Sequence, residues 1–407
     1  MGEILFLAHR VPFPPDRGDR IRSHHLLQAL SRLAPVHVGC FAEGHDPAAE
    51  AALRALAASA CVVRRAKPLL LAGAEAVLTG RPVSLAAFAS RRLAAFVRAT
   101  LAARPISAIV VFSGQMGQFV PDDYPGRVVV DLCDVDSAKF AAYAAAGERV
   151  WLNAREARLL AAEEERLGHR AHATLLISEN EAALYRSRLD APGKVNIRVI
   201  GNGIDAARFD PAAAQPHPAL ARAPGPHFVF TGQMDYRPNE QAALWVIEAL
   251  MPQLRARWPE ACFHVVGRAP TARLRAAVGQ AGVRVWGEVP DVRPFLAAAD
   301  AVLAPLMIAR GVQNKVLEAM AMARPVVLTP EAATGIAARD GVHWLVSPAD
   351  PVAMVGRIAD LLADREAAGR LGAAARRFVI AEHGWEAMLA PLAGLVGIEG
   401  ERARHAA

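Results

Sequence analysis

The chain has 407 residues, of which 53% are hydrophobic and 21% charged, and its formal net charge is +6. That length is long for one hydrophobic core, so we expect two domains, and the composition excludes a largely disordered chain. The four cysteines are far apart and form no CxxC or Cys/His cluster, which argues against structural zinc and predicts the reduced thiols of a cytosolic protein.

The N-terminal half alternates short apolar strands with helices. We predict strands at residues 3–8, 36–41, 61–66, 107–113, 127–133, 173–178 and 196–201. Short continuous apolar runs between helices are typical of a parallel sheet that is buried on both faces. Because the chain enters its first strand directly, we expect no signal peptide, and no apolar run approaches the ~20 residues that span a bilayer.

The loop after the first strand, "HRVPFPPDRGDRIRSHH", combines a glycine with several charges at a helix start. Glycine lets an anion approach the backbone, and the free N–H groups of a helix start attract it. The alternative is an ordinary loop with solvated arginines. We predict substrate contacts from Gly18 and Asp19, which are surrounded by Arg10, Arg17, Arg20 and Arg22.

The segment "SRRLAAFVRATLAARP" predicts a helix with three arginines beside an apolar face. Arg91, Arg92 and Arg98 lie near Leu93 and Val97 in helical spacing. Such a helix can rest on an anionic membrane surface, although an ordinary surface helix has the same pattern. We therefore expect any membrane contact to be peripheral and sensitive to salt.

Three carboxylates lie at the carboxyl end of the buried strand at 127–133. Asp131, Asp134 and Asp136 can orient sugar hydroxyls, bind a divalent metal, or cap the next helix together with Ser137. Capping accounts for only one of them. We favour substrate contact through Asp134 and Asp136 over metal binding.

A stretch rich in Gly, Pro and Asp at residues 201–227 predicts a linker, after which the strand pattern restarts. Further strands are expected at 228–232, 262–267, 283–287, 301–305, 325–329 and 343–347. The fold class is therefore α/β, with two doubly wound, Rossmann-like domains at 1–205 and 206–380, and a helix at 381–398 that crosses back to the first domain. Ligands of such sheets bind beyond the carboxyl ends of the strands, so the cleft between two facing domains is the expected site.

The loop after the first strand of the second domain mirrors the one in the first domain. In "FTGQMDYRPNEQ", Gly232 ends the strand, and Gln233 and Arg237 are expected to contact a diphosphate. Asn239 is expected to cap the following helix. A solvated turn is the alternative for Arg237.

The segment "ARGVQNKVLEAMAMARPVV" places charges at the start of an otherwise apolar helix. We expect the helix to begin at Gly311, whose N–H would bind phosphate, and Lys315 and Glu318 to point to the same side. A diphosphate beside the lysine and a ribose beside the glutamate would suit a nucleotide, whereas the alternative is a structural ion pair. The predicted catalytic residues are Lys315, Arg310 and Glu318, with Val312 and Asn314 as further substrate contacts.

Three motifs in order resemble the retaining glycosyltransferase family 4, which has the GT-B fold. They are "VIGNGIDAARFDP", "NKVLEAMAMARPVVLT" and "HGWEAML". More narrowly, "PFPPDRGDRIRSHHLLQAL", "FSGQM", "VVDLCDVDSAKF" and "GVQNKVLEAMA" resemble the sugar transferases of exopolysaccharide clusters in PEP-CTERM/exosortase systems. No G-x-G-x-x-G follows the first strand and no P-loop motif occurs, which argues against dinucleotide and P-loop enzymes.

The family resemblance assigns roles to several residues. Glu318 matches the second acid of the family's E-x7-E motif, which binds the ribose, whereas the first acid is replaced by Arg310, so the donor sugar cannot be carried over. Gln233 stands where the family has an arginine. Gly18 matches the glycine loop that faces the leaving phosphate, and Gly335 lies in a loop expected to close over the nucleotide.

The resemblance implies transfer of a hexose-type sugar from a nucleotide-diphosphate donor to a hydroxyl, with retention of configuration. The acceptor is expected to be a glycan or lipid-linked glycan at the inner face of the cytoplasmic membrane. We expect a cytoplasmic protein without cofactor, metal or nucleic-acid partner. Two alternatives stay open: a nucleotide-sugar epimerase of the same fold, and an inactive nucleotide-sugar-binding subunit.

Overall fold

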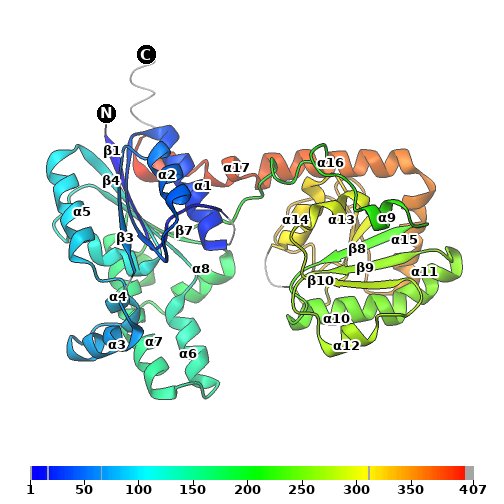
Figure 1. The fold of residues 1–407 in the computed structure, drawn as a ribbon, viewed down its shortest axis with the longest axis horizontal. Coiled ribbons are helices and arrows are strands. Elements are labelled where there is room, and N and C mark those ends of the chain that lie inside the picture. The colour runs from blue at the N-terminus through cyan, green and yellow to red at the C-terminus, as the bar shows by residue number, and fades with distance from the viewer. Residues whose placement is uncertain (1, 16–17, 66, 310–311, 399–407) are drawn as a thin grey trace, which may run out of the picture. The chain divides into compact units, whose positions relative to one another are not determined.

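The computed structural model describes residues 2–15, 18–65, 67–309 and 312–398. The chain forms two compact units, of which the first comprises residues 1–202 with 388–407 and the second residues 203–387. The sequence placed the boundary after residue 205, whereas the units divide after Asn202. Each unit is an α/β domain with helices on both faces of its sheet (Figure 1).

The first unit contains a seven-stranded parallel sheet in the order β3-β2-β1-β4-β5-β6-β7. All residues of β1 and β2 are buried, which explains why these strands appear as continuous apolar runs in the sequence. The seven predicted strands are confirmed. They are β1 Glu3–Ala8, β2 Val36–Ala42, β3 Ser59–Arg64, β4 Ile106–Phe112, β5 Arg127–Cys133, β6 Ala173–Leu176 and β7 Ile197–Val199.

Three helices of this unit begin after side chains that accept from free backbone N–H groups. Asp46 accepts from the Ala49 N–H at 3.0 Å and Ser90 from the Leu93 N–H at 3.2 Å. The helices are α1 Gly18–Leu33, α2 Pro47–Leu56, α3 Leu69–Leu78, α4 Val83–Ala87, α5 Arg91–Ala103, α6 Asp136–Ala145, α7 Val150–Arg170, α8 Glu179–Arg186 and α18 Leu392–Val396, with 3-10 turns at Gly114–Phe119 and Pro192–Lys194.

The membrane contact predicted for helix α5 does not agree with the surroundings of this helix. Leu93 and Val97, one turn apart, are buried in the core of the first unit, and the arginines Arg91, Arg92 and Arg98 are exposed on the opposite side. The apolar face of α5 therefore packs against protein and is not available to a bilayer. Among the described residues, no helix is long and apolar enough to cross a membrane.

The second unit contains a six-stranded parallel sheet in the order β10-β9-β8-β11-β12-β13, and its predicted strands are also confirmed. The strands are β8 His227–Thr231, β9 Cys262–Val266, β10 Val283–Gly287, β11 Ala301–Ala304, β12 Val326–Leu328 and β13 Leu345–Val346. The helices are α9 Pro218–Ala221, α10 Arg237–Trp245, α11 Met251–Arg257, α12 Ala272–Ala276, α13 Arg293–Ala298, α14 Asn314–Ala321, α15 Pro351–Ala363 and α16 Arg365–His383, with a π-helical turn Val246–Leu250 between α10 and α11.

In both sheets the order in which successive strands are added reverses beside the first strand. The order passes from β1 to β4 in the first unit and from β8 to β11 in the second. In doubly wound sheets ligands bind outside the carboxyl ends of the strands at such a switch point. The loops after β1, β4, β8 and β11 are therefore the places to examine for a site.

The C-terminal segment is broken where the sequence predicted one helix over residues 381–398. Helix α16 ends at His383, α17 covers Trp385–Leu389, and α18 follows Pro391. Helix α16 belongs to the second unit, where Arg376 Nη1 donates to the Phe209 carbonyl at 2.7 Å. Helix α18 belongs to the first unit, where Arg127 Nη1 donates to the Gly394 carbonyl at 3.4 Å.

Candidate functional site

Two glycines shape the carboxyl end of β8 in the second unit. Gly232 and Gly267 both have φ of +152°. A Cβ on Gly267 would lie 1.6 Å from the Gly232 carbonyl oxygen, and a Cβ on Gly232 would lie 2.9 Å from Asn239 Nδ2 and 3.1 Å from Lys315 Nζ. Glycine is therefore required at both positions, and it lets polar side chains approach the backbone closely.

Lys315 is the buried cation of this site. It lies in the first turn of α14, is 9% exposed, and donates from Nζ to Asn239 Oδ1 at 2.5 Å. The ammonium also lies 4.2 Å from the centroid of the Phe230 ring, a cation–π contact. Burial lowers the pKa of Lys315 to about 7, and the nearby Glu318 only partly opposes this.

Asn239 has a different role from the predicted one. It is the third residue of α10 rather than the residue before it, and its side chain is buried. Its Nδ2 donates to the Gln233 carbonyl at 2.9 Å while its Oδ1 accepts from Lys315. Asn239 thus positions the lysine against the glycine loop and does not cap α10.

Glu318 lies on the same helix as Lys315 but forms no ion pair with it within 4.0 Å in the described part of the chain. It keeps some exposed surface although most of its surroundings are protein. Burial raises the pKa of Glu318 to about 7, partly offset by the charges of Arg208 and Lys315. The predicted alternative, a structural ion pair, is absent. Two side chains with displaced pKa values beside a glycine loop are typical of a functional site.

The start of α14 lies later than the sequence predicted. The helix begins at Asn314, not at Gly311. Val312 is 41% exposed and lies outside the helix, so it does not contribute to a buried helix face, and Asn314 is also exposed. Arg310 and Gly311 lie outside the described residues.

The remaining predicted residues of this unit are at or near the surface. Gln233 accepts from Arg268 Nη2 at 2.5 Å through Oε1, so its side chain is held by a neighbouring loop. Arg237 is exposed at the first position of α10, and Gly335 is exposed in the turn after β12 with φ of +84°. Thr231, which precedes Gly232, is 3% exposed and its hydroxyl has no hydrogen-bond partner within the described chain.

In the first unit, the loop after β1 holds a cluster of charges. Asp19 accepts from Arg10 and lies 3.3 Å from His9 Nε2, while Arg10 Nε donates to Glu43 at 2.8 Å. The hydrogen bond with His9, followed by that with Arg10, holds the pKa of Asp19 well below its usual range. Gly18 begins α1 and is exposed, with no atom within 4 Å of an added Cβ. Packing therefore does not require glycine there.

The three carboxylates at the carboxyl end of β5 have different surroundings. Asp131 is fully buried and pairs with Arg22 Nε at 2.8 Å, and Arg22 Nη1 donates to the Gly201 carbonyl at 3.2 Å. Asp136 accepts from Lys139 Nζ at 2.5 Å. Asp134 is exposed, and its pKa is raised by partial burial and by the negative charges of Glu181 and Asp136. Asp134 and Asp136 are thus the two acids available to a ligand.

Neither Asp136 nor Ser137 caps α6, contrary to the alternative considered from the sequence. The residue before the helix is Val135, which makes no side-chain cap. Ser137 donates from Oγ to Glu164 Oε2 at 2.6 Å, and burial raises the pKa of Glu164 to about 7. These contacts join α6 to α7 inside the unit.

Residues that the sequence analysis missed lie at the β1–β4 switch point. His9 stacks on Phe112 with ring centroids 5.5 Å apart. Ser113, the residue after β4, has φ of +77°, and its hydroxyl contacts Gln115, whose Nε2 donates to Asp136 at 3.3 Å. A non-glycine residue at positive φ is uncommon and often marks a functional loop. The signal was present, because "FSGQM" directly follows a buried strand.

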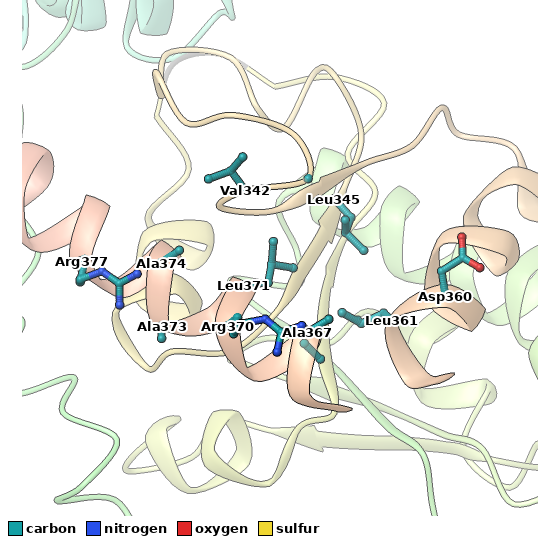
Figure 2. A pocket seen from close by; sticks show the side chains of 12 residues that line it. Val342, Leu345, Asp360, Leu361, Ala367, Arg370, Leu371, Ala373, Ala374 and Arg377 are labelled. Carbon is teal, nitrogen blue, oxygen red and sulfur yellow. The ribbon is translucent and has the colours of Figure 1, made fainter. Parts of the chain in front are cut away.

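A hollow of the second unit lies away from these residues. Figure 2 shows a cavity of about 580 Å³ over α15, α16 and β13, with Leu361 and Leu371 in its floor and Arg370 and Arg377 along it. None of the candidate residues lines it. Among the described residues, no group of three His, Cys, Asp or Glu side chains could hold a metal ion, and the expectation of metal-independent activity stays a prediction.

Comparison with known proteins gives a family match within the second unit. Residues 225–364, which include β8, Gly232, Lys315 and Glu318, match the family described as "Glycosyl transferases group 1". No curated protein matches the chain. The match lies entirely within the second unit.

Solved structures show the same fold over the whole chain. The sucrose-phosphate synthase of Thermosynechococcus elongatus is 18% identical, with 100% of both chains covered and a TM-score of 0.59. HepE of Anabaena, in complex with UDP and glucose, is 16% identical with 100% of this chain and 99% of that chain covered and a TM-score of 0.55. WaaG, a glycosyltransferase involved in lipopolysaccharide biosynthesis, is 17% identical with 97% and 100% covered and a TM-score of 0.57.

These likenesses confirm the predicted fold class, two Rossmann-like domains of the GT-B type. They are all below 25% identity, so they show the fold alone. The match of residues 225–364 adds the enzyme class. The chain is therefore an enzyme of the glycosyltransferase class, with its matched domain in the second unit.

Proposed function

We propose that the protein transfers a sugar from a nucleotide-diphosphate sugar to a hydroxyl acceptor with retention of configuration, as in family 4. One observation carries this proposal: a nearly buried lysine, with its pKa lowered to about 7, lies 3.1 Å from the place where a Cβ of Gly232 would be. A buried cation beside an open backbone at a switch point is suited to a diphosphate.

The donor would restore the charge of Lys315. A diphosphate close to Nζ stabilises the ammonium, so its pKa rises on binding. When the glycosidic bond breaks, negative charge grows on the β-phosphate, and a lysine already held by Asn239 stabilises it without reorganising. Arg237 and the first N–H groups of α14 supply further positive potential, and Glu318 accepts from the ribose hydroxyls. HepE, solved with UDP and with UDP-glucose, supports a nucleotide sugar as donor.

The acceptor would bind to the first unit. Asp134 and Asp136 offer carboxylate oxygens to sugar hydroxyls, and His9 lies after β1 at the switch point of the same sheet. We propose a glycan or lipid-linked glycan of exopolysaccharide synthesis, at the inner face of the cytoplasmic membrane, as the acceptor. The involvement of WaaG in lipopolysaccharide biosynthesis and the resemblance to exosortase-associated sugar transferases support this class.

The first test is a thermal-shift panel of nucleotide sugars on the whole chain, with Lys315→Ala as the matched variant. A ligand that binds only the folded protein raises its Tm, so one nucleotide should raise the Tm of the wild type and affect the variant much less. If no nucleotide sugar shifts the wild type, the proposed donor site is wrong.

The second test distinguishes a transferase from the alternatives by its products. A transferase releases nucleotide and free sugar slowly when water replaces the acceptor, and chelator should not stop this release. An epimerase would interconvert two nucleotide sugars, and an inactive subunit would bind the donor without changing it. Either of these two outcomes would replace the proposed reaction.

A further inference from the structure

The first unit exposes an apolar surface that the proposed reaction does not use. Helix α3 presents Leu70, which is 89% exposed, and Leu78, which is 87% exposed. Within the described residues of this unit, seven of the eight exposed large apolar side chains lie on α3 and at the α6–α7 turn. We name this set the α3–α7 surface: Leu70, Leu71, Val77, Leu78, Tyr143, Val150 and Trp151.

The parts of this surface are held together by hydrogen bonds. Arg155 of α7 donates from Nη2 to the Ala76 carbonyl at 2.8 Å, and the Glu156 carboxylate accepts from the Val83 N–H at 2.8 Å. Trp151 precedes Arg155 by four residues and so lies on the same side of α7. The apolar side chains of α3 and the start of α7 therefore form one neighbourhood, and Figure 1 shows α3, α6 and α7 together at the lower end of the unit.

Helix α3 buries two of its alanines and exposes four of its large apolar side chains. Ala72 and Ala76 are 0% exposed, whereas Leu70, Leu71 and Leu78 are exposed. Its ten residues contain one charged side chain, Glu75, which Lys67 neutralises. Folding alone would favour the reverse arrangement, because each exposed leucine forgoes burial. Seven large apolar side chains exposed in one region of a unit indicate an interaction site.

Exposed basic side chains border the apolar ones. Arg149 adjoins Val150 and Trp151, and Arg158 lies two turns along α7 on the side of Trp151. Lys139, which pairs with Asp136, lies one turn before Tyr143. Glu148 is the exposed acid within this border, and Glu156 is buried. Leucine and tryptophan surrounded by Lys and Arg is the composition of helices that lie in the interface of an anionic bilayer.

We propose that the α3–α7 surface docks the enzyme onto an anionic lipid bilayer. Ten helical residues span only about 15 Å, so α3 enters the interface and does not cross the membrane. The inference rests on the proposed function in one respect: a lipid-linked acceptor gives the enzyme a reason to be at a membrane. It places the contact on α3 and α7, not on the arginine-bearing α5.

The test is sedimentation of the whole protein with vesicles of phosphatidylethanolamine and phosphatidylglycerol, compared with phosphatidylcholine alone. Wild type should bind the anionic vesicles, and added salt should weaken the binding. Leu70→Ser with Leu78→Ser should lower the partition coefficient on the order of 100-fold, about tenfold for each leucine. Val352→Ser, at a residue 69% exposed in the second unit, is the matched control and should change nothing.

Three outcomes would overturn the docking surface. The wild type does not bind anionic vesicles; the leucine variant binds as well as the wild type; or the wild type is a dimer without lipid and the leucine variant a monomer, in which case a second copy covers the surface. No donor is needed, so failure here leaves the proposed reaction standing. Conversely, if the protein binds vesicles but no nucleotide sugar raises its Tm, the proposed sugar transfer is wrong and the proposed docking of the α3–α7 surface stands.

Discussion

Each unit holds side chains of opposite charge in largely buried surroundings, and the two sets differ in how well their charges are satisfied. In the first unit, Arg22 and Asp131 are 2% and 0% exposed and lie 2.8 Å apart. Burial lowers the pKa of Arg22 and the charge of Asp131 raises it, and the charge prevails. In the second unit, burial brings the pKa values of Lys315 and Glu318 to about 7 from opposite directions.

This difference distinguishes a structural ion pair, Arg22 with Asp131, from two side chains that can bind a ligand, Lys315 and Glu318. Asp131 also accepts from the Cys133 N–H at 3.1 Å, and Arg22 Nη1 donates to Gly201 and Asn202. Each charge therefore has partners without any ligand, although Arg22 Nη2 is buried without a hydrogen-bond partner among the described residues. Lys315 has an amide and an aromatic ring but no anion within 4.0 Å among the described residues. A charge that folding leaves poorly satisfied is a charge that a ligand can satisfy.

The largest expected effect is on the structural pair. Arg22→Met leaves Asp131 buried without its cation, and we expect the free energy of unfolding to fall by about 3–5 kcal/mol. Urea unfolding measures this. The double variant Arg22→Met with Asp131→Leu should recover much of the loss. If the single variant is as stable as the wild type but inactive, Arg22 belongs to the functional site and the contrast between the two units is wrong.

The next effect is on catalysis. Lys315→Ala removes the cation beside the leaving diphosphate, so kcat should fall on the order of 100-fold. The Tm without nucleotide should stay near that of the wild type, because a lysine with a lowered pKa already costs stability when buried. Steady-state kinetics and a melting curve measure the two quantities. Unfolding of the variant, with normal donor affinity in the folded fraction, would make Lys315 structural.

A smaller effect is expected on donor binding. Glu318→Gln keeps the shape of the side chain but accepts more weakly from two ribose hydroxyls, so KM for the donor should rise on the order of tenfold while kcat changes little. Ribose contacts are equal in the ground and transition states, which is why the effect appears in KM. An equal fall in kcat would give Glu318 a role in the chemical step.

The same two residues predict a pH profile of stability. The pKa of Glu318 is raised from 4.5, so its stabilising contribution is full below pH 4.5 and is lost as the pH rises to about 7. The pKa of Lys315 is lowered from 10.5, so the unfolded chain holds more protons between about pH 7 and 10.5 and stability rises there.

We therefore compare the free energy of unfolding of the ligand-free wild type with that of the double variant Lys315→Met with Glu318→Gln. The wild-type value minus the variant value should have a minimum near pH 7 and should change on the order of 1 kcal/mol between pH 7 and 9. Urea unfolding of both proteins across the pH range measures it, because other titrating groups cancel in the difference. A flat difference would mean that the two side chains keep ordinary pKa values.

Local pattern was enough to predict the strands and the glycine loop of the second unit. Buried parallel strands are continuous apolar runs, and Gly232 directly follows one of them. The contacts that define the site were not predictable in this way. Lys315 meets Asn239 across 76 positions and Arg22 meets Asp131 across 109, and helical spacing within one segment contains no information about such partners.

Helix orientation was the other limit. A run such as "LLLAGAEAVL" is apolar on every side, so nothing in its period shows that Leu70, Leu71 and Leu78 face outward. The arginine-bearing α5 has a clear amphipathic pattern, but its membrane contact was still predicted wrongly. A helix that faces the core and a helix that faces a membrane have the same amphipathic pattern. By contrast, Gly384 and Pro391 were visible breaks in the predicted C-terminal helix.

The smallest effect compares the mirrored glycine loops of the two units. Gly18→Ala adds a Cβ with no atom within 4 Å, and glycine is not needed for its backbone, so the free energy of unfolding should change by no more than about 0.5 kcal/mol. Gly232→Ala is the matched variant, and its Cβ would meet Asn239 and Lys315 at a strained φ, so both stability and nucleotide binding should fall. A stable Gly18→Ala protein whose kcat falls tenfold or more would place the leaving phosphate beside Gly18, as the family resemblance implies, because only a ligand can then be close to the added methyl group. Unchanged kinetics would leave Gly18 as an ordinary helix start and concentrate phosphate binding in the second unit.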